Sequence, residues 1–127
     1  MNYIAIVHKD KDSTYGVTLP DFPGCFSAAD EIGDIQRGVQ EAVEVYAEGE
    51  EGFLPPVPKT LDEVSSMKEA EGGVLMLVDV SFDFLDETVV PVNISMPAYM
   101  RERIDRAARK RGLTRSAYLV RAAQAFN

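Results

Sequence analysis

Apolar positions near the start of the chain fall in short runs that are separated by turn residues. Residues 2–9 contain the run Ile-Ala-Ile-Val, which is too short for a helix and predicts a strand. A second strand is predicted over 14–19, after a polar turn. Pro23 and Gly24 fit the central positions of a type II turn, because proline presets a negative φ and glycine accepts the positive φ that follows. A third short strand is predicted over 25–29.

Residues 34–48 have the spacing of an amphipathic helix. Their apolar side chains recur every three or four positions and form one stripe, made of Ile35, Val39, Ala42, Val43 and Tyr46. Asp34 is expected to cap the start of this helix and Gly49 its end. Gly38 lies inside the helix, where glycine costs about 1 kcal/mol relative to alanine, so we expect another part of the chain to pack closely against it.

The chain then passes through a proline-rich stretch into a further strand. The prolines of residues 55–58 predict an extended connector, since proline cannot propagate a helix. Thr60 and Glu63 have the spacing of a capping box and predict a short helix that ends near residue 70. Alternating apolar residues over 74–82 predict the last strand of this part. The order β-β-β-α-β, with one extra short helix, indicates an α+β fold over residues 1–86.

The last 39 residues predict one strand followed by two helices. Over 89–96, apolar and polar side chains alternate as in a strand. A helix is expected from about Pro97, with a narrow apolar stripe formed by Met100, Ile104, Ala107 and Ala108. Gly112 is suited to end this helix, and Thr114 to cap a second helix that runs to about residue 126.

That second helix is apolar on almost every side, which implies that it is buried. A unit of 39 residues is too small to bury it alone and would ordinarily need a metal, a disulfide or a partner subunit. The chain has one histidine, His8, and one cysteine, Cys25, so a homodimer is the favoured solution and no cofactor or metal is expected. The predicted dimer core consists of Val90, Val92, Ile94, Met96, Tyr118 and Leu119.

Charge divides the 127-residue chain sharply near residue 88. Residues 1–88 carry 5 Lys and Arg against 19 Asp and Glu, a net of −14, whereas residues 89–127 carry 8 against 2, a net of +6. A short basic module is typical of nucleic-acid binding, while an acidic body favours a basic protein partner. Glu41, Glu44 and Glu48 on the predicted helix are candidates for that contact by charge alone.

Other features of the sequence favour a cytoplasmic protein. No apolar run approaches the roughly 18–20 residues that a membrane span needs, so we expect no membrane association. The N-terminus lacks the basic start and cleavage site of a signal peptide. The single Cys25 excludes an intrachain disulfide, which fits a reducing compartment.

Two segments of residues 89–127 resemble the ribbon–helix–helix family of dimeric DNA-binding proteins. Residues 92–97, Val-Asn-Ile-Ser-Met-Pro, are similar to its strand-to-helix junction, and 112–116, Gly-Leu-Thr-Arg-Ser, to its inter-helix turn. The resemblance implies that two strands pair into a ribbon that enters the major groove of double-stranded operator DNA. The outward side chains Pro91, Asn93 and Ser95 would then face the bases, and asparagine is suited to adenine. The residues Thr114, Arg115 and Ser116, at a helix N-terminus, suit a phosphate.

The run Leu-Pro-Asp-Phe-Pro-Gly-Cys at residues 19–25, with the helix 34–48 that follows, resembles the signature of HicB-type antitoxins. Together with the ribbon–helix–helix module at 89–127, the resemblance spans almost the whole chain. It implies a type II toxin–antitoxin system, in which residues 1–86 adopt a partial RNase H-like fold and bind a small, basic ribonuclease toxin of the HicA type. It also implies that the module represses the shared operon, as a homodimer or as a tetramer of two dimers.

Three other functions fit part of the sequence. The first is a stand-alone ribbon–helix–helix repressor whose N-terminal domain senses a small ligand, and the second is a protein-interaction module whose basic tail binds an acidic protein. The third, an RNase H-like enzyme, is disfavoured because such enzymes need several carboxylates around metal ions, one of them within the first strand. Here the core of that strand is Ile4 to Val7, and Asp10 comes only after its end. We therefore expect no catalytic residues.

Overall fold

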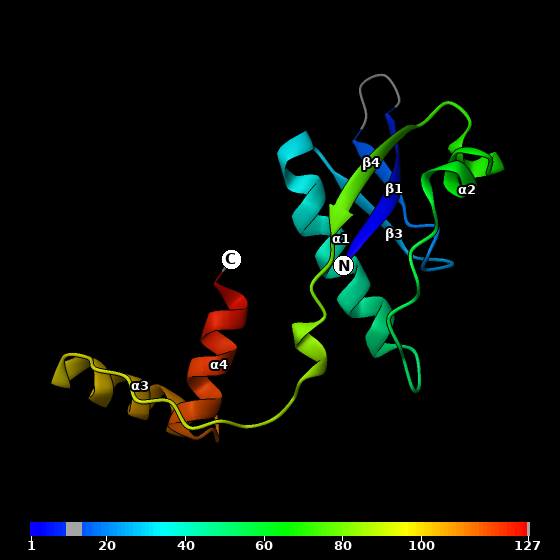
Figure 1. Cartoon of the computed structure of the whole chain (residues 1–127). Coiled ribbons are helices and arrows are strands. Elements are labelled where there is room, and N and C mark those ends of the chain that lie inside the picture. Colours follow the sequence, from blue (N-terminus) through cyan, green and yellow to red (C-terminus); the bar gives the residue numbers. More distant parts are fainter. Residues whose placement is uncertain (10–13, 127) are drawn as a thin grey trace. The chain divides into compact units, whose positions relative to one another are not determined.

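The computed structural model describes residues 1–9 and 14–126 and divides the chain into two compact units, Met1–Thr88 and Val89–Asn127 (Figure 1). The division coincides with the change in charge near residue 88. The polar turn predicted between the first two strands lies at 10–13, outside the described residues.

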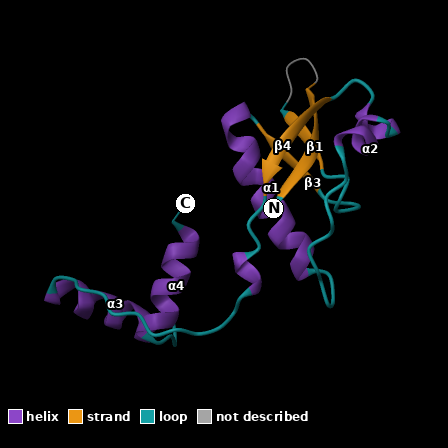
Figure 2. Cartoon of the chain, in the orientation of Figure 1, coloured by secondary structure: helices purple, strands orange, loops and turns teal. Residues whose placement is uncertain are grey.

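The first unit contains a four-stranded antiparallel sheet, coloured orange in Figure 2. Its strands are β1 (Asn2–Lys9), β2 (Tyr15–Thr18), β3 (Phe26–Ala29) and β4 (Val74–Asp79), in the order β3-β2-β1-β4. The four strands predicted for this part are confirmed, but the last one ends at Asp79 instead of continuing to residue 82. Ala5 and Ile6, which point to opposite faces of β1, are both fully buried. The apolar run in β1 is therefore the signature of a strand that is covered on both faces.

The helix α1 (Ile35–Glu48) packs across one face of this sheet. Its buried residues repeat at every fourth position and are Ile35, Val39, Val43 and Ala47. They meet Tyr3, Ala5 and Val78 of the sheet in the main core. Side-chain amides of α1 also hold the end of β4 and the residues after it. Gln36 accepts the Asp79 N–H at 3.0 Å, and Gln40 both accepts the Ser81 N–H (2.9 Å) and donates to the Ser81 carbonyl (2.8 Å).

The two predicted caps of α1 have different outcomes. Gly49 is the C-cap, and its N–H donates to the Val45 carbonyl at 3.2 Å. Asp34 makes no capping hydrogen bond, so that prediction is wrong. A turn of 3₁₀ helix, η1 (Ile32–Asp34), runs directly into α1 and gives Asp34 a helical conformation, in which its carboxylate accepts from Arg37 at 3.1 Å instead.

The turn before β3 has the conformation that its sequence predicts. Gly24 has a φ of +85°, and the Cys25 N–H donates to the Phe22 carbonyl at 2.8 Å. The turn places the ring of Phe22 in the core, 4.9 Å from the ring of Tyr3 and 5.8 Å from that of Tyr46. The Phe-Pro-Gly-Cys sequence thus fixes both a chain reversal and an aromatic core residue.

The segment between α1 and β4 contains two short helical elements. Thr60 caps α2 (Leu61–Ser65) by accepting the Glu63 N–H at 3.2 Å, as the sequence predicts. The helix that was expected to reach residue 70 ends at Ser65, and a 3₁₀ turn, η2 (Lys68–Ala70), follows after a break. A further 3₁₀ turn, η3 (Asp83–Leu85), comes after β4.

The second unit consists of α3 (Ala98–Lys110) and α4 (Arg115–Ala125). Gly112 follows α3 with a φ of +67°, and Thr114 caps α4 by accepting the Ala117 N–H at 3.1 Å, so both predicted helix boundaries are confirmed. The predicted strand over 89–96 is absent from the single chain. A strand exists only where a neighbouring strand completes its ladder of hydrogen bonds, and none of the described strands pairs with this segment.

Within the part of the chain that the structure describes, none of the helices is both long enough and apolar enough to cross a membrane.

Candidate binding surfaces

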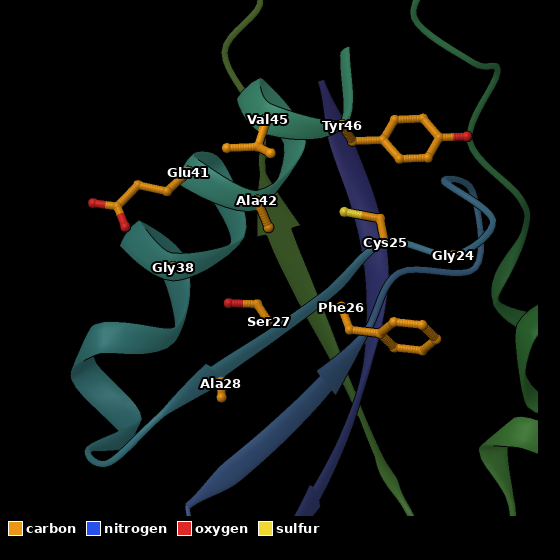
Figure 3. A pocket seen from close by; sticks show the side chains of 10 residues that line it. All are labelled: Gly24, Cys25, Phe26, Ser27, Ala28, Gly38, Glu41, Ala42, Val45 and Tyr46. Carbon is orange, nitrogen blue, oxygen red and sulfur yellow. The ribbon is translucent and has the colours of Figure 1, made fainter. Parts of the chain in front are cut away.

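A groove of about 400 Å³ separates β3 from the C-terminal half of α1 (Figure 3). We call it the β3–α1 groove. One wall is residues 24–28 and the other is α1, which contributes Gly38, Glu41, Ala42, Val45 and Tyr46. The lining is mostly apolar, with Glu41 as its charged member.

At Gly38, α1 approaches β3 closely. A methyl group added to Gly38 would lie 2.8 Å from the Ser27 Oγ, a distance that side-chain carbons do not adopt. Figure 3 shows the Ser27 side chain directed toward Gly38. The close packing that a glycine inside the helix predicts is therefore confirmed.

Two large apolar side chains are exposed at the groove. Phe26 is 67% exposed and Val45 is 69% exposed. Cys25, in contrast, is buried, and its burial raises the pKa of the thiol. Exposed apolar side chains that gather at one place often mark a protein-binding surface.

The three acidic candidates lie on the same side of α1 as Val45. Positions 41, 44, 45 and 48 are related by helical steps of three and four residues, so they form one face. Glu41 lines the β3–α1 groove, Glu48 is exposed and Glu44 is half-buried. The sequence identified the charges but gave no sign of the groove beside them, since the groove depends on how the helix lies against the strand.

A second cavity, of about 250 Å³, lies near the end of α1. Its lining includes Asp21, Phe22, Tyr46, Glu50, Glu51 and Phe53. The buried Asp21 carboxylate accepts the Lys59 N–H through Oδ1 at 2.9 Å, while its Oδ2 has no hydrogen-bond partner among the described residues. Nearby, the Tyr3 hydroxyl donates to the Pro56 carbonyl at 2.8 Å. Burial, and to a lesser extent the charge of Asp21, raises the pKa of Tyr3. These contacts fasten the proline-rich connector to the core.

The predicted base-reading residues Pro91, Asn93 and Ser95 are all exposed in the second unit. The predicted dimer-core residues are uncovered too: Val90, Val92 and Ile94 are between 60% and 72% exposed, and Met96, Tyr118 and Leu119 are half-buried. No residue of α4 is fully buried in the single chain. The burial that its apolar sequence predicts is therefore not provided by the described chain itself.

The predicted phosphate site at the start of α4 contains an ion pair that sequence reasoning missed. The Arg115 guanidinium donates to both carboxylate oxygens of Asp105, at 2.7 and 2.8 Å. This hydrogen bond, together with the charge of Arg115, holds the pKa of Asp105 below its usual value and raises the pKa of Arg115. Thr114 serves as the helix cap, and Ser116 is exposed. Nothing in the sequence marks the pair, because its members lie on different helices.

The described residues include no group of three or more His, Cys, Asp or Glu side chains placed to hold a metal ion. The His8 ring hydrogen-bonds the Glu71 carbonyl at 3.0 Å, while Cys25 precedes β3, which lies two strands away from β1. The structure thus does not place this histidine and this cysteine on neighbouring strands, as a thiol nucleophile and its base would require.

The chain thus combines an acidic sheet-and-helix unit that carries a mostly apolar groove with a basic two-helix unit. Residues 3–123 match the family described as HicB_like antitoxin of bacterial toxin-antitoxin system. The chain belongs to this HicB-like antitoxin family.

Known proteins and structures agree with this assignment. The crystal structure of the Burkholderia pseudomallei antitoxin HicB is 34% identical, with a TM-score of 0.55, and the match covers 100% of this chain and 99% of that one. A chain in the HicA3 and HicB3 toxin-antitoxin complex is 29% identical, with a TM-score of 0.54, over 64% of this chain and 99% of that one. An uncharacterized 14.9 kDa protein of Haemophilus phage HP1 is 31% identical over 107 residues, which are 83% of this chain and 80% of the relative.

Proposed function

We propose that this chain is the antitoxin of a toxin–antitoxin pair and neutralises a small, basic ribonuclease toxin of the HicA type by direct binding. The first unit, for which we propose a partial RNase H-like fold, would hold the toxin and cover its active site. The observation that carries the proposal is the match to HicB antitoxins over nearly the full chain. A further similar structure is that of a HicA3 and HicB3 toxin-antitoxin complex, which supports the identity of the partner. The net charge of −14 on residues 1–88 independently suits a basic protein.

The experiment that tests this part is purification of the tagged chain from its native host after nuclease treatment. We expect one small basic protein in near-equal amount, and we expect that protein to arrest growth when it is expressed without this chain. Recovery of the chain alone, or of a partner that is harmless by itself, would contradict the proposal.

We further propose that residues 89–127 form a ribbon–helix–helix dimer that represses the antitoxin's own operon through the major groove. The basic net charge of +6 supports DNA binding, and the uncovered Val90, Val92 and Ile94 support pairing with a second copy. In such a dimer, residues 89–96 would pair with the same residues of the second copy and form the strand that the single chain lacks. Asn93, Ser95 and Pro91 would then face the bases, and the N-terminus of α4 would face a phosphate.

Replacement of Asn93 tests the proposed reading face. Asn93→Ala is expected to cost about 1–3 kcal/mol of operator binding and to relax the base preference at one position, because the alanine side chain cannot bond to a base edge. The same substitution at the exposed Asn2 in the first unit is the control and should leave operator affinity unchanged. Equal affinity and selectivity of Asn93→Ala and the parent would show that this register is wrong. The measurement is a fluorescence-anisotropy titration against the operator and single-base variants of it.

A further inference from the structure

The strand β3 ends the sheet at one side and offers backbone groups to a further strand. Within the described residues β3 pairs only with β2, in the register Thr18–Phe26 and Val17–Ser27. The Leu19 N–H donates to the Cys25 carbonyl, which makes that pair a hydrogen-bonded one. Hydrogen-bonded and non-hydrogen-bonded pairs alternate in an antiparallel ladder, so the N–H and carbonyl of Phe26 point away from β2 toward the open edge.

Apolar side chains lie on both sides of this edge. Side chains of neighbouring residues in a strand point to opposite faces, and Figure 3 shows Ser27 directed toward α1 while Phe26 is directed away from it. On the side to which Ser27 points, Ala42 and Val45 of α1 line the β3–α1 groove. An extended segment added at the edge would alternate in the same way, placing one side chain in the groove and the next beside Phe26.

Charge determines which kind of segment fits. Glu41 lines the groove, and the unit as a whole has a net charge of −14. A second copy of the same acidic unit would be repelled, whereas a basic chain would be attracted. The occupant is therefore expected to combine apolar side chains with flanking lysine or arginine residues.

We propose that an extended, basic segment of the protein partner adds to the open edge of β3 and inserts an apolar side chain into the β3–α1 groove between Ala42 and Val45. This inference rests on the proposed function and adds to it the surface and the mode of recognition. Backbone hydrogen bonds to Phe26 supply affinity, as in other complexes in which a peptide extends a sheet. The groove and Glu41 select the side chains.

The structure offers a matched pair of valines for the test. Val45 borders the groove and is 69% exposed, while Val74 lies on β4, at the opposite edge of the sheet, and is 71% exposed. Val45→Lys and Val74→Lys change the net charge equally, so long-range repulsion of a basic partner is the same in both. Any difference between the two variants reports local contact. The probe is the purified HicA-type toxin from the same operon, inactivated in its catalytic residue, and the measurement is calorimetric titration of the full chain.

We expect Val45→Lys to weaken binding at least tenfold and Val74→Lys to remain within about threefold of the parent. Toxin binding should increase the protection of the Phe26 N–H against hydrogen exchange and leave that of Leu75, which points to the open edge of β4, unchanged. The proposed surface would be overturned by equal affinities of the two variants. It would also be overturned if Val74→Lys lost more affinity than Val45→Lys and the amides of β4 gained the protection. A change in the sedimentation of the chain alone on Val45→Lys would overturn it in favour of a second copy. A parent chain that fails to bind the toxin would refute the proposed function itself, whereas tight binding that ignores Val45 would refute only this surface.

Discussion

Asp105 and Arg115 form the strongest polar contact described in the second unit, and it gives this unit a pH-dependent stability. Two charge-assisted hydrogen bonds, of 2.7 and 2.8 Å, join the side chains across α3 and α4. The lowered pKa of Asp105 means that the folded state favours the ionised carboxylate. The resulting stabilisation is complete above the ordinary pKa of an aspartate, about 3.9, and is lost as the pH falls through the lowered value.

We therefore predict that Asp105→Asn lowers the melting temperature at pH 7, because the neutral amide cannot form the ion pair. The difference from the parent should shrink as the pH falls below about 4, where the parent carboxylate begins to take up a proton. Thermal unfolding followed by circular dichroism across this pH range checks the prediction. A difference in melting temperature that stays constant at every pH would show that the pair contributes through packing and not through charge.

Gly38 allows a second prediction at the residue scale. Alanine would favour the helical conformation by about 1 kcal/mol, but its methyl group would lie 2.8 Å from the Ser27 Oγ. In a Ser27→Ala background that oxygen is gone, so Gly38→Ala should be more favourable there than in the parent. We expect a coupling energy on the order of 1 kcal/mol from the four urea unfolding curves of this double-mutant cycle. Additive effects would mean that the Ser27 side chain rotates away and that its oxygen does not oppose the methyl group.

At the scale of single elements, the sequence predicts those that its local pattern determines. Strands β1 to β4 follow from short apolar runs between turn residues, and α1 from its stripe of every third and fourth position. Whether a predicted N-cap side chain forms its hydrogen bond depends on the backbone conformation at that residue. Thr60 and Thr114 are themselves extended and cap their helices, whereas Asp34 adopts a helical conformation at the end of a 3₁₀ turn and makes no capping hydrogen bond.

The remaining features depend on contacts between elements and leave no local signal. The β3–α1 groove depends on how α1 lies against β3, and the Asp105–Arg115 pair on the packing of two helices. The segment 89–96 has the alternation of a strand and forms none in the single chain. Alternation of apolar and polar residues indicates which face of a strand would be buried. The strand itself forms only when a neighbouring strand supplies the backbone hydrogen bonds.

That segment gives a prediction at the element scale. Val92 is 72% exposed in the single chain, and in the proposed dimer it would be buried in the core beneath the two-stranded ribbon. Val92→Asp should therefore shift the chain from dimer to monomer in analytical ultracentrifugation, because it buries a charge in the interface. Val57→Asp, in the proline-rich connector where the valine is 87% exposed, is the control and should leave the mass unchanged. A dimer that persists in Val92→Asp would place the interface elsewhere.

At the scale of the whole molecule, the boundary near residue 88 separates two units of opposite charge. An acidic unit repels nucleic acid and a basic unit attracts it, so in the proposed function the charges would direct the protein and DNA partners to different parts of the chain. This separation suits a protein with two binding tasks. It also explains why the net charge of −8 for the whole chain hides the basic unit.

The measurement that tests the central claim most directly is a titration of toxin activity. The HicA-type toxin from the same operon is assayed for RNA cleavage while the purified full-length chain is added in known amounts. The account predicts that cleavage falls linearly and stops near one chain for each toxin molecule, because tight binding covers the active site. Cleavage that continues undiminished in the presence of excess chain would contradict the account.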